Sequence, residues 1–315
     1  MRPYGLIDLH CDTLTECKYT NTGYLDTLED PGRVLRLSNM AEGVHWAQFY
    51  AVWIQDCYQR QEAMDFFRRS ADNFDRQMKK FSNLGVPCQT MEEGEAAWAQ
   101  GKRAAILTIE DGAVLGGRLE NAAYVRSRGV RCMTIVWNGI NEIGSGHSSE
   151  SGLTDFGKQI IPEMERLGIL VDISHLNDAG VKDLFEVAEK PFIATHSNAR
   201  SVCAHKRNLT DDMIREMVRR DCLIGLNYFI KFLSDDWEHV TPDDFYRHIC
   251  RFFELGAEKN LALGSDYDGC TLPEFFSSPE KVVENADYLL GRGLTEDQIQ
   301  GIYWRNAYDF LKKNL

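Results

Sequence analysis

The chain has 315 residues, of which 43% are hydrophobic, and this is enough for a large core within one domain. Its formal net charge of −13 argues against a nucleic-acid partner, because a phosphate backbone is neutralised by Lys and Arg. No apolar run reaches the roughly 20 residues of a membrane helix, and we recognise neither a secretory signal nor a lipid-anchor signal, so we expect a cytoplasmic protein without a membrane partner. The nine cysteines form no C-x-x-C pair and indicate buried thiols in a reducing compartment.

Short apolar runs bounded by polar turns predict eight strands. Most of these runs are rich in Ile, Val and Leu, as strands buried on both faces should be. The predicted strands are residues 5–9, 46–53, 104–109, 132–136, 170–173, 192–195, 223–226 and 261–264.

Helical patterns separate these strands. Apolar residues recur at helical spacing, and capping or acidic residues stand where several of the helices begin. The predicted helices are residues 62–84, 155–167, 178–188 and 213–220, with a further helix that opens at Thr241 and Pro242. Strands that alternate with helices predict a mainly parallel sheet, and eight of them predict a closed (β/α)8 TIM barrel. We therefore expect one α/β domain over residues 1–315.

Residues of the metal-binding kind follow five of the predicted strands. They are His10 and Asp12, Glu110, His175, His196, and Asp266. Residues two apart in a strand point to the same side, so the first two can converge on one ion. A barrel gathers the carboxyl ends of its strands on one face, where barrel active sites lie. The pattern therefore predicts a barrel of the metal-dependent hydrolase type.

The chemistry of this set suits Zn²⁺, which binds imidazoles and carboxylates. Two ions about 3.5–4 Å apart would let a bridging hydroxide attack at neutral pH, and Asp266 could accept and return its proton. Each piece also has a plainer interpretation, since His10-x-Asp12 is often a capped strand end and Glu110-Asp111-Gly112 a turn. Independent turns, however, have no reason to place ligand-type residues repeatedly at strand ends, so the joint pattern favours a metal site.

Six segments together resemble the membrane (renal) dipeptidases, the zinc peptidases of family M19. They run in family order along nearly the whole chain. The matching segments are 7–13 (IDLHCDT), 109–112 (IEDG), 171–175 (VDISH), 195–198 (THSN), 207–211 (RNLTD) and 263–269 (LGSDYDG). This resemblance implies a dipeptidase with two Zn²⁺ ions per chain.

The resemblance also implies a role for each residue. His10 and Asp12 would bind one zinc together with Glu110, and Glu110 would bridge to a second zinc that His175 and His196 hold. Asp266 and Glu110 are thus the expected catalytic carboxylates, with Asp266 as the proton shuttle.

The expected substrate contacts follow from the same resemblance. Arg207 would pair with the terminal carboxylate of a dipeptide, although by itself it would be interpreted as a surface cation of the basic stretch 205–207. Trp137 stands where members of the renal type carry a substrate-contacting His. Polarisation of the scissile carbonyl would then come from zinc, from Trp137 Nε1, or from another residue, for which Asn138 and His147 are candidates. Tyr228 completes the expected substrate-binding set.

We therefore expect hydrolysis of dipeptides, with those carrying a C-terminal D-residue as a candidate class. The alternative is another binuclear-metal amidohydrolase that acts on a lactam, an N-acyl amino acid or a phosphoester, because fold and metal do not define the substrate. A non-catalytic scaffold is disfavoured, since none of the expected ligands is damaged. Relatives tend to dimerise, which makes a homodimer a further expectation.

Overall fold

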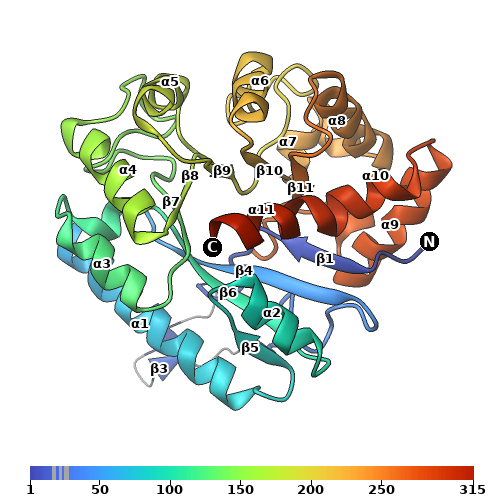
Figure 1. The fold of residues 1–315 in the computed structure, drawn as a ribbon, viewed down its shortest axis with the longest axis horizontal. Helices are drawn as coiled ribbons and strands as arrows, with labels where there is room; N and C mark the ends of the chain where they lie inside the picture. The colour runs from blue at the N-terminus through green and yellow to red at the C-terminus, as the bar shows by residue number, and fades with distance from the viewer. Residues whose placement is uncertain (16–18, 21–22, 25–27) are drawn as a thin grey trace.

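A computed structural model describes residues 1–15, 19–20, 23–24 and 28–315 of the chain (Figure 1). Eight parallel strands form a closed ring, in which the first strand pairs with the last through Asp8 and Leu263. In order around the ring they are β1 (Gly5–Asp8), β4 (His45–Trp53), β6 (Arg103–Glu110), β7 (Cys132–Thr134), β8 (Leu170–Asp172), β9 (Ile193–Ala194), β10 (Leu223–Leu226) and β11 (Leu261–Leu263). The predicted (β/α)8 barrel is therefore confirmed.

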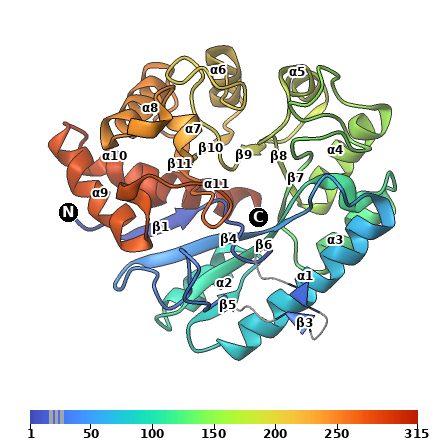
Figure 2. The same ribbon diagram turned by 180° about the vertical axis from the view of Figure 1, so that it is seen from behind.

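Helices surround this ring, as Figures 1 and 2 show from opposite sides. They are α1 (Arg60–Lys80), α2 (Met91–Trp98), α3 (Glu120–Ser127), α4 (Asp155–Leu167), α5 (Asp178–Val187), α6 (Asp211–Arg219), α7 (Ile230–Leu233), α8 (Pro242–Glu254), α9 (Pro279–Gly291), α10 (Glu296–Gln300) and α11 (Asn306–Asn314). Short turns of 3₁₀-helix occur at η1 (Gly112–Leu115), η2 (Trp237–His239) and η3 (Glu274–Phe276), and a π-helical turn, η4 (Gly301–Arg305), leads into α11. Among the described residues, none of these helices combines the length and the apolar character that a bilayer crossing requires.

Local sequence explains where the helices begin and end. At α4 the hydroxyl of Thr154 accepts a hydrogen bond from the backbone of Gly157, and Gly168 ends the helix in a left-handed conformation with φ of 69°. At α8 Thr241 and Asp244 form a reciprocal capping box. These signals are readable in the sequence, and both helices begin where they were predicted.

The end of α1 differs from the prediction. The helix stops at Lys80 instead of continuing to residue 84, and the chain then enters a short strand, β5 (Gly85–Pro87), that pairs with the first residues of β6. Strand β9 is also shorter than predicted, because the backbone N–H of Thr195 donates to the side chain of Asp172 instead of continuing the strand. A second, antiparallel sheet of β2 (Tyr19–Thr20) and β3 (Gly23–Tyr24) lies within the segment that had no prediction.

The two ends of the barrel are built differently. Helix α11 crosses the ring of strands in Figure 1, and its Phe310 and Leu311 are buried together with side chains of β1, β4 and β6. It closes the end of the barrel from which β9, β10 and β11 start. The opposite end of the barrel, at the carboxyl termini of the strands, carries the predicted ligands.

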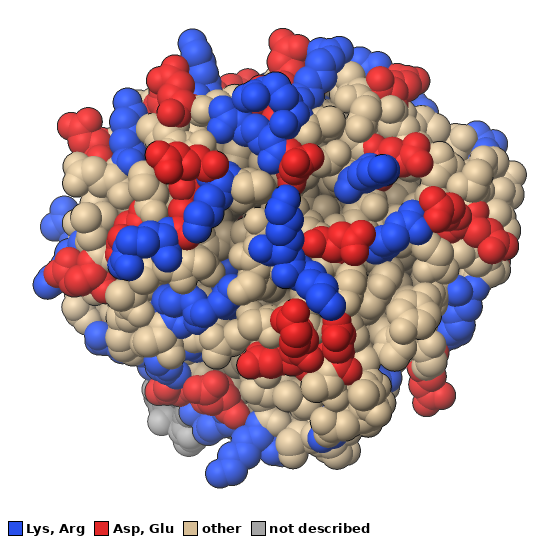
Figure 3. Space-filling view, in the orientation of Figure 1, with Lys and Arg blue, Asp and Glu red and all other residues tan. Residues whose placement is uncertain are grey.

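On the face that Figure 3 shows, acidic and basic side chains are interspersed over the described residues.

Candidate active site

The predicted metal ligands meet at the carboxyl end of the barrel. Glu110 is the last residue of β6, and the others stand within four residues of the ends of β1, β8, β9 and β11. His175 Nε2 lies 3.0 Å from Glu110 Oε1, and His10 Nε2 lies 3.5 Å from Glu110 Oε2. His196 Nε2 lies 3.6 Å from Glu110 Oε1 and 3.0 Å from His175 Nε2. Side chains that follow strands far apart in the sequence therefore form one small cluster.

Glu110 stands between two groups of ligands. Its Oε2 faces His10, whereas its Oε1 faces His175 and His196. Two sets of three residues bring their ligand atoms within 4.8 Å of one another: His10, Glu110 and His196 form one set, and His10, Asp12 and Asp266 form the other. A carboxylate that directs its two oxygens at two groups has the geometry needed to bridge two cations.

The buried carboxyl groups of the cluster favour a positive charge beside them. Burial, with the neighbouring Glu110 carboxylate, raises the pKa of Asp12 to about 6. Burial also raises the pKa of Asp266 to about 7, with further contributions from Asp12 and Glu110. Burial alone lowers the pKa of His10, but the charges of Glu110 and Asp12 raise it well above its usual range.

The other two imidazoles are suited to ligation. Burial lowers the pKa of both His175 and His196 well below the usual range, and nearby positive charges lower it further. Both rings are therefore neutral near pH 7, which is the form that binds a metal. Within the described residues, His10 Nε2 and Asp12 Oδ1 are buried without a hydrogen-bond partner. Unpartnered ligand atoms in a set of imidazoles and carboxylates fit a divalent cation such as Zn²⁺.

The backbone is strained at this end of the barrel. His175 and Asp266 have left-handed φ angles of 70° and 62°, which non-glycine residues rarely adopt. Asp111 has φ of 93°, and its side chain accepts a hydrogen bond from the backbone of Ala113 at 2.8 Å. Gly112 allows this close turn, because a Cβ there would lie 2.3 Å from the side chain of Ile143. The Glu110-Asp111-Gly112 segment is therefore both a tight turn and part of the cluster.

A cavity of about 220 Å³ opens over the ligands. Two aromatic pairs contribute to its wall: Trp53 packs edge to face on Trp137, and Phe229 packs edge to face on Phe232. Further lining residues are Asp12, Glu110, Asn138, His175, Asp266, Gly269 and Cys270. The structure thus places two of the four predicted substrate contacts, at positions 137 and 138, in the cavity wall.

Sequence reasoning missed four of the lining side chains: Trp53, Phe229, Phe232 and Cys270. A signal existed for the first, because Trp53 ends a predicted strand at the same end of the barrel as the ligands. The two phenylalanines lie at the start of α7, a one-turn helix that no periodicity reveals.

Tyr228 is a correction to the predicted substrate contacts. Its ring is 1% exposed, stacks on Phe276 with centroids 4.0 Å apart, and packs on Phe245 and Tyr267. It does not line the cavity. The side chain of Tyr228 points into the hydrophobic core, whereas that of the adjacent Phe229 lines the cavity.

Arg207 is buried, not a surface cation. Its guanidinium donates to Ser197 Oγ at 2.9 Å and to the carbonyl of His196 at 3.0 Å, and its Nε has no hydrogen-bond partner among the described residues. It lies behind the cavity wall, 5.7 Å from the ring of Phe232. Within the described part of the chain, no carboxylate forms a salt bridge with this guanidinium.

His147, one of the two candidates for the substrate contact, does not line the cavity. Burial, and then the charge of Arg207, lowers its pKa to about 3, so the ring is neutral. Its backbone carbonyl accepts a hydrogen bond from Lys206, and the side chain is not part of the cavity wall. Asn138, the other candidate, lines the cavity and places its Oδ1 3.0 Å from His175 Nδ1.

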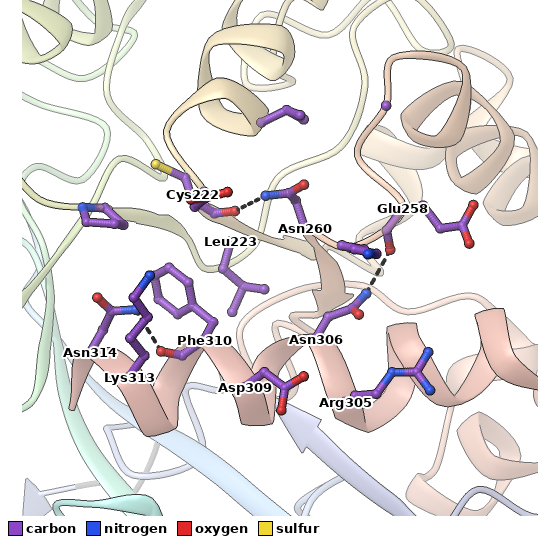
Figure 4. A pocket seen from close by; sticks show the side chains of 15 residues that line it. Cys222, Leu223, Glu258, Asn260, Arg305, Asn306, Asp309, Phe310, Lys313 and Asn314 are labelled. Atoms are coloured by element: carbon purple, nitrogen blue, oxygen red, sulfur yellow. Dashed lines mark hydrogen bonds between the residues drawn. The ribbon is translucent and has the colours of Figure 1, made fainter.

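A larger cavity of about 750 Å³ lies at the opposite end of the barrel (Figure 4). Two asparagines that line this cavity donate hydrogen bonds to the backbone: Asn260 to the carbonyl of Cys222, and Asn306 to the carbonyl of Glu258. The first bond joins the segments that precede β10 and β11, and the second ties α11 to the amino end of β11. The smaller cavity is the better candidate for the active site, because only there do buried ligand-type side chains converge among the described residues.

Comparison with known proteins identifies the family to which the chain is similar. The model of the membrane dipeptidase family, peptidase family M19, matches residues 1–314. A metallopeptidase of family M19 called dipeptidase AC superposes with a TM-score of 0.92 at 24% identity, covering 99% of both chains. A metallopeptidase from Rhodobacter sphaeroides, liganded with a phosphinate mimic of the dipeptide L-Ala-D-Ala, gives 0.91 at 23% identity, covering 99% of this chain and 100% of the other.

A more distant structure, the probable dipeptidase PvdM from Pseudomonas aeruginosa, gives a TM-score of 0.80 at 16% identity, covering 99% of this chain and 96% of the other. These structures share the barrel, and the family model spans almost every residue, so the resemblance predicted from the six segments is confirmed. The chain therefore belongs to the membrane dipeptidase family, peptidase family M19, a family of enzymes that hydrolyse peptide bonds.

Proposed function

We propose that this protein is a zinc-dependent dipeptidase with two Zn²⁺ ions per chain. The observation that carries the proposal is Glu110, whose two carboxylate oxygens face two different groups of ligand atoms. His10 and Asp12 would hold one ion with Glu110, and His175 and His196 would hold the other with it. Such a pair of ions supplies Lewis acidity toward the scissile carbonyl and a nucleophilic water at neutral pH.

Asp266 is the proposed proton carrier. Its Oδ2 accepts a hydrogen bond from Asn227 at 3.0 Å, and its Oδ1 lies 3.9 Å from His10 Nε2, within the cluster and in the cavity wall. The Asn227 contact orients the carboxylate and leaves Oδ1 facing the reacting centre. This oxygen takes the proton of the attacking water and delivers it to the departing amine.

The proposed substrate is a small dipeptide. A cavity of about 220 Å³ with aromatic walls and a polar floor suits a ligand of this size. The Rhodobacter sphaeroides structure carries a mimic of L-Ala-D-Ala, which supports including dipeptides with a C-terminal D-residue. Arg207, buried beside the cavity with an unpartnered Nε, is the proposed partner of the substrate carboxylate.

Trp137 gives the cavity a character that a His would not. Its indole offers one N–H donor and a broad apolar face, and it cannot accept a hydrogen bond. Trp137 is therefore proposed to pack against a substrate side chain, while Asn138 positions His175.

We also propose a reducing, cytoplasmic setting. The eight described cysteines are all free thiols, and Cys270 lines the cavity, where oxidation would add bulk. Retention of these thiols is easiest to understand in a compartment that keeps them reduced.

The test is metal analysis and a turnover panel on one preparation. We expect about two zinc ions per chain, hydrolysis of L,L or L,D dipeptides, and loss of turnover on chelation that added zinc restores. The panel includes a lactam, N-acyl amino acids and a phosphoester. Zinc-loaded protein that ignores every dipeptide but cleaves one of these other classes would replace the proposal with the alternative hydrolase.

A further inference from the structure

Thr195 joins one of the proposed ligands to a buried carboxylate. Its Oγ1 lies 2.7 Å from His196 Nδ1 and 2.6 Å from Asp172 Oδ2. Asp172 and His196 are fully buried and Thr195 is 2% exposed, so water does not compete for these contacts. The three side chains form a hydrogen-bonded chain from β8 to the side of the imidazole that points away from the cluster.

The donors and acceptors of Asp172 determine the direction of these hydrogen bonds. Asp172 receives four donors: the backbone N–H groups of Ser174 and Thr195 on Oδ1, and the hydroxyls of Thr134 and Thr195 on Oδ2. A carboxylate only accepts hydrogen bonds, so its contact with the Thr195 hydroxyl must be donated by Thr195. The single hydroxyl proton of Thr195 therefore points to Asp172.

The hydroxyl oxygen of Thr195 must then accept from its other neighbour. His196 Nδ1 can supply that bond only if it carries the ring proton. The neighbouring Ser174 hydroxyl, 3.3 Å from Thr195, accepts from the backbone N–H of His196 and can itself donate to Thr195, so it does not reverse this order. With its proton on Nδ1, the neutral ring presents a lone pair at Nε2 to Glu110 and His175.

We propose that Asp172 and Thr195 hold His196 in the tautomer that a metal requires, before any metal arrives. Thr195 is thus a positioning residue for the proposed zinc site, and the inference rests on the proposed function for its purpose. Partners at the outer nitrogen of a ligating His typically change metal affinity by about 10- to 100-fold. Here the partner is a hydroxyl whose direction a buried carboxylate determines.

The contrast with His175 makes the assignment specific. The outer nitrogen of His175 faces Oδ1 of Asn138, a residue on an exposed loop whose amide can also present its N–H₂ group. Rotation of that amide would allow either tautomer of His175. No equivalent freedom exists for Thr195, because reversal would require one of four donors to leave Asp172.

The experiment uses full-length protein freed of zinc and labelled with ¹⁵N-histidine. Long-range ¹H–¹⁵N NMR gives the tautomer, the His196 signals being identified by their loss in His196→Gln. We expect a protonated Nδ1 in the wild type and in Thr195→Ser, and a mixture of tautomers in Thr195→Val. Zinc titration against a chromophoric chelator should show one site weakened about 10- to 100-fold in Thr195→Val and restored in Thr195→Ser.

The matched control is Thr134→Val, which removes the other hydroxyl from the same Asp172 oxygen without touching His196. It should lower the melting temperature while leaving the tautomer and zinc affinity at wild-type values. A wild-type His196 protonated at Nε2 overturns the inference whatever the variants do, and so does a folded Thr195→Val that keeps both the Nδ1 proton and full zinc affinity. Failure of the proposed dipeptidase function would appear separately, as zinc-loaded wild type without dipeptide turnover.

Discussion

Trp53 and Trp137 pack edge to face on the wall of the proposed active site, with ring centroids 5.1 Å apart and planes inclined by 69°. The first ends β4, and the second follows β7, so the pair joins strands on the two sides of β6. Trp137 also lies near His175, with ring centroids 6.2 Å apart. An aromatic wall of this kind favours substrates with apolar side chains.

Trp137→Ala should therefore raise KM more than it lowers kcat. Aromatic pairs contribute about 0.5–1.5 kcal/mol beyond the area that they bury, so we expect a loss of roughly two- to tenfold in kcat/KM, concentrated on dipeptides with apolar side chains. Steady-state kinetics on Leu- and Asp-containing dipeptides measure it. Trp237→Ala, at a tryptophan that is 42% exposed and outside the cavity wall, is the control. Equal losses on both substrates would contradict an apolar contact.

Asp266→Asn should abolish most turnover and spare most of the zinc. The substitution keeps the shape but removes the proton acceptor, and general-base catalysis contributes about 10²- to 10⁴-fold. We expect kcat to fall within this range, with zinc content by elemental analysis close to the wild type. If turnover and zinc disappear together, Asp266 acts as a ligand and not as a proton carrier.

Much of this site could be predicted from residues that follow strands. His10, Glu110, His175, His196 and Asp266 each stand at a strand end, and a parallel barrel gathers strand ends by construction. Periodicity locates the strands, so topology alone brings the five together.

The cavity wall could not be predicted in the same way. Tyr228 and Phe229 are adjacent aromatics, yet one is stacked on Phe276 in the core and the other lines the cavity. They lie just before α7, a single turn whose first residue donates its backbone N–H to the carbonyl of Thr271, far along the chain. The β5 strand was missed for a related reason, since it is three residues long and only its pairing with β6 defines it.

Arg207→Met should weaken dipeptides selectively, because it removes the proposed partner of the substrate carboxylate. Loss of one partner of a buried charge pair is worth about 2–5 kcal/mol, so we expect kcat/KM to fall at least 30-fold. The same dipeptides with a C-terminal amide should be poor substrates of the wild type and lose little more in the variant. A variant that loses the amide and the free acid to the same extent would show that Arg207 supports the fold instead.

Lowering the pH should stabilise the zinc-free protein through the carboxyl groups of Asp12 and Asp266 and weaken the stabilisation that bound zinc provides. The pKa values of Asp12 and Asp266, about 6 and about 7, are raised above those of the unfolded chain, so their protonated forms favour the folded zinc-free protein at low pH. This contribution is complete below about pH 4 and is lost as the pH rises through 6 to 7. Zinc binding requires the proposed ligand Asp12 in its ionised form, so the stabilisation that zinc provides grows as the pH rises through about 6. The difference in melting temperature between the two forms should therefore widen from pH 5 to pH 8. The double variant Asp12→Asn/Asp266→Asn removes both titrating groups, so the melting temperature of its zinc-free form should depend less on pH. An unchanged dependence would show that other groups cause it.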